Sequence, residues 1–149
     1  MFRSDLLEDR VVLVTGGGSG LGLSMAKKFA ALGARVAITG RSEDRLAAAA
    51  GEIDPGGERV LTHPCDVRDF AQVEALAAAV GERWGGVDVL VNNAAGNFLA
   101  ATEDLTPGGF NAVVQTVLYG TFNATLAVGR GMIERGSGGS ILNIVTTYA

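Results

Sequence analysis

A glycine-rich segment, TGGGSGLG at residues 15–22, stands between a short β-branched run and an amphipathic run of the sequence. The preceding run, RVVLVTG at residues 10–16, has the length and aliphatic character of a buried parallel strand. Apolar residues after the glycines follow at spacings of four, four and three, which predicts one helical face: Leu21, Met25, Phe29 and Leu32. A strand, a glycine turn and a helix in this order predict the start of a βαβ unit with parallel strands.

The alternation of strand and helix continues along the whole sequence. Further strands are predicted within residues 34–40, 58–67, 87–96 and 136–145, and further helices within residues 43–53, 69–84 and 107–134. Ser42 and Thr106 are the expected N-caps of two helices, and the last helix is apolar on several sides, which predicts cover on two faces. The pattern predicts one doubly wound α/β domain over residues 1–149, of Rossmann type, with a parallel sheet in strand order 3-2-1-4-5.

Composition and charge exclude several classes of protein. The net charge of −4 argues against a nucleic-acid partner, and no stretch has the roughly 18 apolar residues of a membrane helix. The N-terminus has no apolar signal segment and Cys65 is the sole cysteine, so we expect a cytoplasmic protein without an intrachain disulfide. His63 and Cys65 are too few ligands for a structural zinc site, so no metal is predicted.

The position of the glycine-rich turn indicates a nucleotide site. Between a first strand and its helix, main-chain N–H groups can bind the diphosphate of a dinucleotide. The residues predicted to contact the cofactor here are Gly16, Gly18, Ser19, Gly20 and Leu21. The glycine spacing is G-x-x-x-G-x-G instead of G-x-G-x-x-G, and a glycine turn without a ligand is the alternative interpretation.

The residue after the second predicted strand favours one form of the cofactor. An acidic residue there would bind the 2′-hydroxyl of the adenosine ribose, whereas this chain has Arg41, a bidentate donor suited to a 2′-phosphate. The sequence therefore favours NADP(H) over NAD(H). The alternative is a solvated loop arginine, with Glu43 or Asp44 reaching back to it.

Four segments together resemble the short-chain dehydrogenase/reductase family in order and spacing: TGGGSGLG, CDV at 65–67, NNAAG at 92–96 and ILNIV at 141–145. The resemblance covers the whole chain. It implies that Asp66 and Val67 lie beside the adenine, and that the segment containing Asn93 backs the cofactor and stabilises the sheet. A helix or turn cap for Asp66 and a purely structural role for Asn92 and Asn93 are the alternatives.

Further segments, NNAAGNF followed by TEDLTP and then TTYA at 146–149, resemble the 2,4-dienoyl-CoA reductase branch of that family. By that resemblance Asn97 and Phe98 are substrate residues that face the acyl thioester, and Thr106 contacts the CoA portion. Tyr148 is then the catalytic donor.

The reaction implied by the resemblance is reduction of a 2,4-dienoyl-CoA thioester by NADPH, an auxiliary step of fatty-acid β-oxidation. Negative charge moves to the thioester oxygen, where the Tyr148 hydroxyl and the Asn97 amide would stabilise it. Val117 and Thr146 stand where the family usually has asparagine and serine, which weakens the interpretation as an ordinary ketoreductase. Arg68 is a candidate ligand for a phosphate of the cofactor or of CoA, and a surface arginine is its alternative.

Members of the family continue well beyond the length of this chain. The resemblance therefore implies an incomplete form, truncated after the fifth strand, with the apolar edge SILNIV at 140–145 exposed. We expect a homo-oligomer or pairing with a second chain that supplies the missing half, or else a fragment that binds nucleotide with little catalysis. A generic short-chain ketoreductase or alcohol dehydrogenase and a non-catalytic nucleotide-binding module stay open as alternatives.

Overall fold

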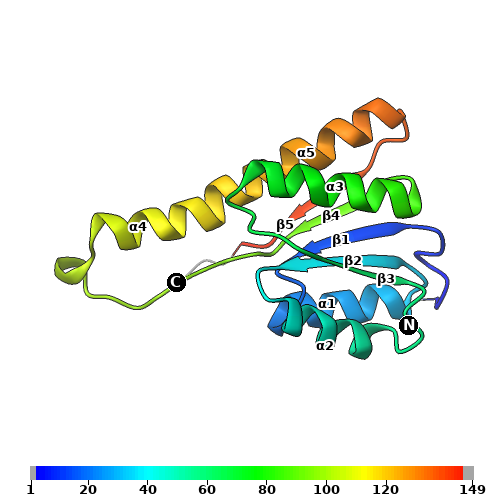
Figure 1. Ribbon diagram of the computed structural model, residues 1–149, viewed down its shortest axis with the longest axis horizontal. Helices are drawn as coiled ribbons and strands as arrows, with labels where there is room; N and C mark the ends of the chain where they lie inside the picture. The colour runs from blue at the N-terminus through cyan, green and yellow to red at the C-terminus, as the bar shows by residue number, and fades with distance from the viewer. Residues whose placement is uncertain (1–2, 146–149) are drawn as a thin grey trace.

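The structure is a computed structural model that describes residues 3–145 (Figure 1). Within these residues one parallel sheet has the strand order β3-β2-β1-β4-β5, with β1 Val11–Thr15, β2 Arg35–Gly40, β3 Val60–Pro64, β4 Val89–Asn92 and β5 Ser140–Asn143. The helices are α1 Gly20–Ala31, α2 Glu43–Ile53, α3 Phe70–Trp84, α4 Pro107–Val114 and α5 Gly120–Arg135, with a 3-10 turn η1 Thr102–Asp104 and a π turn η2 Gln115–Tyr119. The predicted doubly wound α/β class and strand order are confirmed.

Two helical layers cover the sheet, α1 and α2 on one face and α3 and α5 on the other (Figure 1). β1 is buried along its whole length. Val12 and Val14 pack in the cluster on the α1–α2 side, and Val11 and Leu13 pack in the cluster on the α3–α5 side. Burial on both faces explains why this strand is continuously apolar in sequence instead of alternating.

Side-chain caps fix the starts of three helices. The Ser42 hydroxyl accepts a hydrogen bond from the Arg45 N–H at 3.4 Å, and the Thr106 hydroxyl accepts one from the Gly109 N–H at 3.1 Å. Both predicted N-caps are therefore confirmed. Asp69 caps α3 in the same way. Each cap satisfies N–H groups that the first turn of a helix leaves without partners.

The predicted apolar face of α1 is not buried at its first position. The Leu21 side chain is 58% exposed, and the first buried residue of α1 is Gly22. A Cβ at Gly22 would lie 2.3 Å from the Gly16 carbonyl oxygen, so the glycine-rich turn packs directly on this turn of the helix. The main chain of Gly16 thus occupies the space beside α1 that a buried side chain would otherwise fill, and Leu21 stays at the surface.

The helix predicted at 107–134 runs from Pro107 to Arg135, with the π turn η2 joining α4 to α5. Within residues 3–145 the expected cover on two faces is present only along α5, which packs against both α3 and β4. α3 packs against α5, whereas α4 extends past the sheet (Figure 1). Large exposed side chains of this helix include Phe110, Val117, Leu118, Tyr119 and Phe122. On β5, Ile141 and Leu142 are 40% and 47% exposed, which matches the expectation of an uncovered edge.

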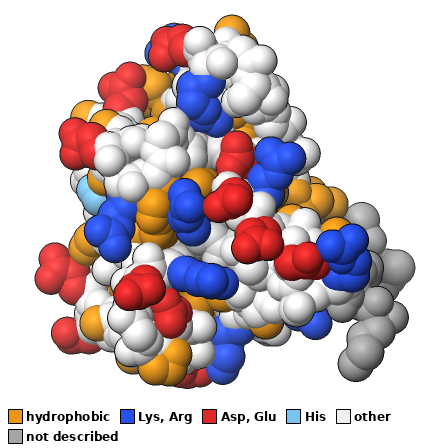
Figure 2. Space-filling view, turned by 90° about the vertical axis from the view of Figure 1, so that its right-hand side faces the viewer, with side chains coloured by type: hydrophobic (Ala, Val, Ile, Leu, Met, Phe, Trp, Pro, Cys, Tyr) orange, Lys and Arg blue, Asp and Glu red, His pale blue; other side chains and the backbone are white. Residues whose placement is uncertain are grey.

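The surface carries charges of both signs. Figure 2 shows Lys and Arg side chains interspersed with Asp and Glu side chains over one face of the molecule. Ion pairs join Lys27 to Glu52 at 3.0 Å and Arg35 to Asp9 at 3.2 Å. None of the helices within residues 3–145 combines the length and the apolar character that a bilayer crossing requires. The cytoplasmic location stays a prediction.

Candidate nucleotide-binding site

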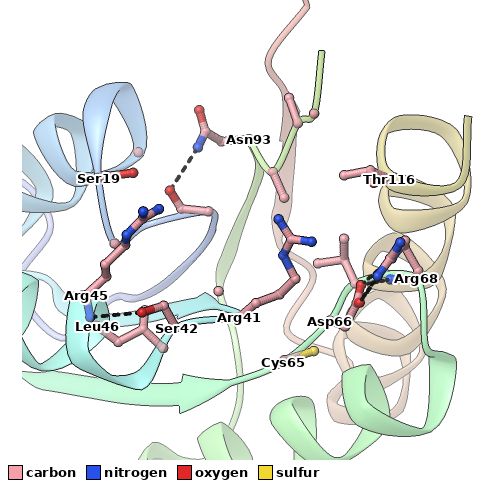
Figure 3. A pocket seen from close by; sticks show the side chains of 18 of the residues that line it. Ser19, Arg41, Ser42, Arg45, Leu46, Cys65, Asp66, Arg68, Asn93 and Thr116 are labelled. Atoms are coloured by element: carbon pink, nitrogen blue, oxygen red, sulfur yellow. Dashed lines mark hydrogen bonds and ion pairs between the residues drawn. The ribbon is translucent and has the colours of Figure 1, made fainter. Parts of the chain in front are cut away.

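A cavity of about 650 Å³ opens at the carboxyl ends of β1, β2, β3 and β4 (Figure 3). Its walls come from the glycine-rich turn, the β2–α2 junction, residues 65–68, residues 93–96 and Thr116 of η2. In open parallel α/β sheets, ligands bind at this edge, where the strand order reverses direction. The reversal lies between β1 and β4, because the chain runs from β1 outward to β3 and then crosses back to β4.

The first turn of α1 reaches this cavity without a side-chain cap. Ser19 occupies the N-cap position, but its side chain makes no capping hydrogen bond, and the first turn contains no acidic residue. By contrast, α2, α3 and α4 all have a side-chain cap. An uncapped helix N-terminus presents N–H groups and the positive end of the helix dipole, so it can bind an anion.

The glycine-rich turn follows a path that requires glycine at two points. Gly16 and Gly20 have φ angles of +66° and +54°, in the left-handed region. The Thr15 hydroxyl oxygen fixes the neighbouring loop, because it accepts hydrogen bonds from the N–H groups of Asn93 and Ala94, each at 2.9 Å. The loop that follows β4 thus backs the glycine-rich turn.

The Asn92 side chain stabilises the sheet and does not line the cavity. The residue is 5% exposed, and its Nδ2 donates to the Thr125 hydroxyl at 3.1 Å and to Asn143 Oδ1 at 2.8 Å. These contacts join β4 to α5 and β5. The structural alternative therefore holds for this asparagine, whereas Asn93 lines the cavity.

Two arginines extend into the cavity from the β2–α2 junction. Arg41 follows β2, Arg45 lies in the first turn of α2, and Figure 3 shows both guanidinium groups directed toward the cavity. Within residues 3–145 neither forms an ion pair, so the alternative in which Glu43 or Asp44 reaches back to Arg41 is not supported. Two such guanidinium groups provide bidentate donors for a phosphate.

Asp66 and Arg68 form an ion pair on the opposite wall (Figure 3). Arg68 Nε lies 2.9 Å and 3.0 Å from the two Asp66 carboxylate oxygens, and the Arg68 N–H donates to Asp66 Oδ1 at 3.1 Å. The guanidinium lowers the pKa of Asp66, and the carboxylate raises the pKa of Arg68. Because the Arg68 charge is already paired, its role as a phosphate ligand stays a prediction.

Cys65 lies at the base of the same wall. Its side chain is 3% exposed, and burial raises the pKa of the thiol to about 11. His63, two residues earlier, belongs to β3. Among the residues that the structure describes, no group of three or more His, Cys, Asp or Glu side chains is placed to hold a metal ion.

Of the predicted substrate residues, Arg68 lines the cavity, whereas Asn97, Phe98 and Thr106 do not. Phe98 packs over Gly109 at the start of α4, where an added Cβ would lie 2.7 Å from the phenyl ring, and is 47% exposed. Thr106 uses its hydroxyl to cap α4, and neither it nor Asn97 lines the cavity. Tyr148 falls outside the described residues. The substrate assignments therefore stay predictions.

Most of the predicted cofactor residues line the cavity: Gly16, Gly18, Ser19, Leu21, Arg41, Asp66, Val67 and Asn93. Gly20, the remaining one, is the first residue of α1. Sequence reasoning missed Arg45 and Thr116, which line the cavity, and the hydrogen bonds by which Thr15 holds the loop after β4. The position of Thr15, the last residue of the strand before the glycines, could have indicated its role. No sequence pattern distinguishes Arg45 from any other arginine in the first turn of a helix.

A model of the short chain dehydrogenase family matches residues 10–149. The chain belongs to the short-chain dehydrogenase family. Over 143 residues it is 41% identical to a probable 2,4-dienoyl-CoA reductase of Bacillus subtilis, with 96% of this chain and 56% of that protein covered. The resemblance drawn from the sequence is confirmed.

Solved structures of short-chain dehydrogenases share the fold. A short chain dehydrogenase from Bacillus anthracis has a TM-score of 0.92 at 44% identity, over 95% of this chain and 57% of that one. Actinorhodin polyketide ketoreductase, solved with NADPH, has a TM-score of 0.86 at 42% identity, over 92% of this chain and 53% of that one. This short-chain dehydrogenase chain therefore spans about half the length of the relatives it matches. Family and fold together indicate the Rossmann-type, nucleotide-binding part of a short-chain dehydrogenase.

Proposed function

We propose that the cavity binds NADP(H) and that the chain supplies the nucleotide-binding part of a 2,4-dienoyl-CoA reductase. The observation that carries this proposal is an uncapped helix N-terminus and two arginines around one cavity. The N–H groups of α1 suit a diphosphate, and Arg41 and Arg45 suit a further phosphate on the adenosine ribose. NADP(H) has phosphate groups at both places.

The sheet order sets the direction in which the cofactor would lie. β2 and β3 are on one side of β1, so Arg41, Arg45 and Asp66 surround the adenosine end of the cavity. β4 and β5 are on the other side, so the nicotinamide end would point toward the loop after β4, which leads to Asn97. When bound, NADPH supplies a hydride for reduction of a conjugated thioester.

The residues of this chain would bind and polarise the substrate. We assign to the Asn97 amide and the Tyr148 hydroxyl hydrogen bonds to the thioester oxygen, where hydride addition places negative charge. Phe98 would contact the acyl chain, and Thr106 would contact the CoA portion of the substrate. Identity of 41% with the probable 2,4-dienoyl-CoA reductase of Bacillus subtilis supports this substrate class.

The active form is proposed to be an assembly. Exposed Ile141 and Leu142 on β5, together with Leu118 and Phe122 on the long helix, leave apolar surface that a partner would cover. Further copies of the chain, or polypeptide that corresponds to the rest of its relatives, are the two proposed partners.

A ketoreductase is the second candidate function. The likeness to actinorhodin polyketide ketoreductase, at 42% identity, supports it. Both functions use the same cofactor-binding half and differ in the substrate that is reduced. A ketoreductase reduces a carbonyl carbon, and a dienoyl-CoA reductase reduces a conjugated carbon chain.

Nucleotide titration and a substrate panel test the proposal. We expect the purified chain to bind NADPH more tightly than NADH, measured by nucleotide fluorescence. In the assembled enzyme we expect NADPH oxidation with a 2,4-dienoyl-CoA and not with a 3-ketoacyl thioester. Reversed substrate preference would favour the ketoreductase, binding without turnover would favour a non-catalytic module, and failure to bind either nucleotide would contradict all three.

A further inference from the structure

The cavity wall formed by residues 66–68 is held from α5 by a buried side chain. Asn123 is 7% exposed, and its Nδ2 donates a hydrogen bond to the Val67 carbonyl oxygen at 2.9 Å. A buried carbonyl oxygen without a hydrogen-bond donor has an uncompensated desolvation penalty, which destabilises the structure. This bond therefore favours one position of Val67 over any position displaced from α5.

One helical turn earlier, α5 approaches the same residue at close contact. A Cβ on Gly120 would lie 2.6 Å from Val67 Cγ2, closer than real side-chain atoms pack. Gly120 and Asn123 are three positions apart, so they share one face of the helix. Glycine permits the close approach, and asparagine provides the hydrogen bond.

The opposite side of residues 66–68 is held by the start of α3. Gln72 Oε1 accepts a hydrogen bond from the Asp66 N–H at 2.9 Å, and Gln72 Nε2 donates to Asp69 at 2.9 Å. Asp69 in turn caps α3. The wall is thus fixed between the first turns of two helices, and Asn123 is its hydrogen-bonding contact on the α5 side.

We propose that Asn123 is a positioning residue for the adenosine half of the cofactor, because it holds Val67 and the adjoining Asp66 where the cavity wall meets the adenine. This inference rests on the proposed function, since it takes a dinucleotide as the occupant. Asn123 does not line the cavity, so it acts through residues 66–68. A wall that is already in place loses less conformational freedom on binding, which raises affinity.

Two substitutions act on this contact from different sides. Asn123→Leu keeps the branching and the number of heavy atoms of the side chain and removes the donor, and Gly120→Ala adds a methyl group against Val67. Asn111→Leu is the matched control, because it makes the same change at an exposed position of α4. Val67→Ala, added to Gly120→Ala, removes the methyl group that the new Cβ would meet.

Calorimetric titrations of the 149-residue chain would use 2′,5′-ADP for the adenosine half and reduced nicotinamide mononucleotide for the other half. We expect Asn123→Leu and Gly120→Ala each to weaken 2′,5′-ADP binding about tenfold. Binding of the mononucleotide should not change, and Asn111→Leu should bind both ligands like the unaltered chain. Val67→Ala should restore part of the affinity that Gly120→Ala loses.

The outcomes separate this inference from the proposed function. If the unaltered chain binds neither half, the proposed function fails. If the unaltered chain binds both ligands, two results would overturn the inference and leave the proposed function standing. One is an unchanged affinity of Asn123→Leu for 2′,5′-ADP, and the other is an equal loss of affinity for 2′,5′-ADP and for the mononucleotide. Should Asn123→Leu not fold, Gly120→Ala decides by the same two titrations. Loss of folding in both variants would assign Asn123 a general structural role and also overturn the inference.

Discussion

Asn93 and Thr15 are joined by two hydrogen bonds, although 78 residues separate them in the chain. The Asn93 N–H donates to the Thr15 hydroxyl oxygen at 2.9 Å, and Asn93 Nδ2 donates to the Thr15 carbonyl oxygen at 3.0 Å. Thr15 ends β1 and Asn93 follows β4, the strands between which the sheet order reverses. The glycine-rich turn and the loop after β4 are therefore one connected part of the cavity wall.

Replacement of Thr15 should destabilise the fold. Thr15→Val keeps the shape of a side chain that is 2% exposed and removes the acceptor for the N–H groups of Asn93 and Ala94. We expect the free energy of unfolding to fall by about 1–3 kcal/mol, measured by urea denaturation. Thr62→Val on β3 is the control, because its hydroxyl makes no hydrogen bond within the described residues. The control should change stability by less than about 0.5 kcal/mol, and equal effects would contradict the prediction.

Two glycine-to-alanine substitutions should change the free energy of unfolding in opposite directions. A Cβ at Gly22 would lie 2.3 Å from the Gly16 carbonyl oxygen and 2.6 Å from Asn93 Nδ2, so Gly22→Ala should cost about 1–3 kcal/mol of stability. At Gly51 on α2 a Cβ would have no neighbour within 4 Å, so Gly51→Ala should stabilise by about 0.4–1 kcal/mol. Urea denaturation of both variants provides the comparison. Destabilisation of similar size in both would rule out the steric explanation.

Removal of Arg41 should change the choice of nucleotide. Arg41→Ala is expected to weaken NADPH binding about tenfold or more and to leave NADH binding nearly unchanged, because only the 2′-phosphate loses a charge-assisted partner. Fluorescence titration with the two nucleotides measures the ratio. Arg59→Ala removes the same charge at an exposed position and serves as the control. An equal loss for NADPH and NADH would contradict a role in 2′-phosphate recognition.

The Cys65 thiol should resist alkylation while the chain is folded. Burial raises the pKa of this thiol to about 11, so its reactive thiolate form grows only as the pH rises toward that value. We expect slow iodoacetamide labelling at about pH 8 in the folded chain and fast labelling in urea, where the pKa returns to about 8.5. Bound NADPH should slow labelling further, because Cys65 lines the cavity. Mass spectrometry follows the reaction, and rapid labelling of the folded chain would refute the expectation.

Local contacts explain why most of the fold could be predicted. Ser42 and Thr106 each bond to an N–H group three residues later, so a short window of sequence contains the whole interaction. The bond from Asn123 to Val67 spans 56 residues, and no periodicity marks it. The exposure of Leu21 on the predicted apolar face of α1 has a related cause, since spacing alone does not show that main chain packs at that position.

In the candidate site, too, the features that follow from local sequence could be predicted and those that depend on tertiary contacts could not. Composition and position identified the glycine-rich turn and Arg41, because both follow directly from a strand end. Arg45 and the pairing of Asp66 with Arg68 depend on side-chain directions that sequence does not give. The long helix at 107–134 shows a further limit, since an apolar pattern indicates a face that needs cover without indicating what covers it.

β1 supplies alternate side chains to both hydrophobic clusters, Val12 and Val14 to one and Val11 and Leu13 to the other. Neither layer of helices can detach without exposing one face of this strand. Release of either layer thus weakens the support of the other, which makes the two halves a single cooperative unit. The amide hydrogens of β1 should accordingly exchange with deuterium only through global unfolding, later than those of the projecting α4.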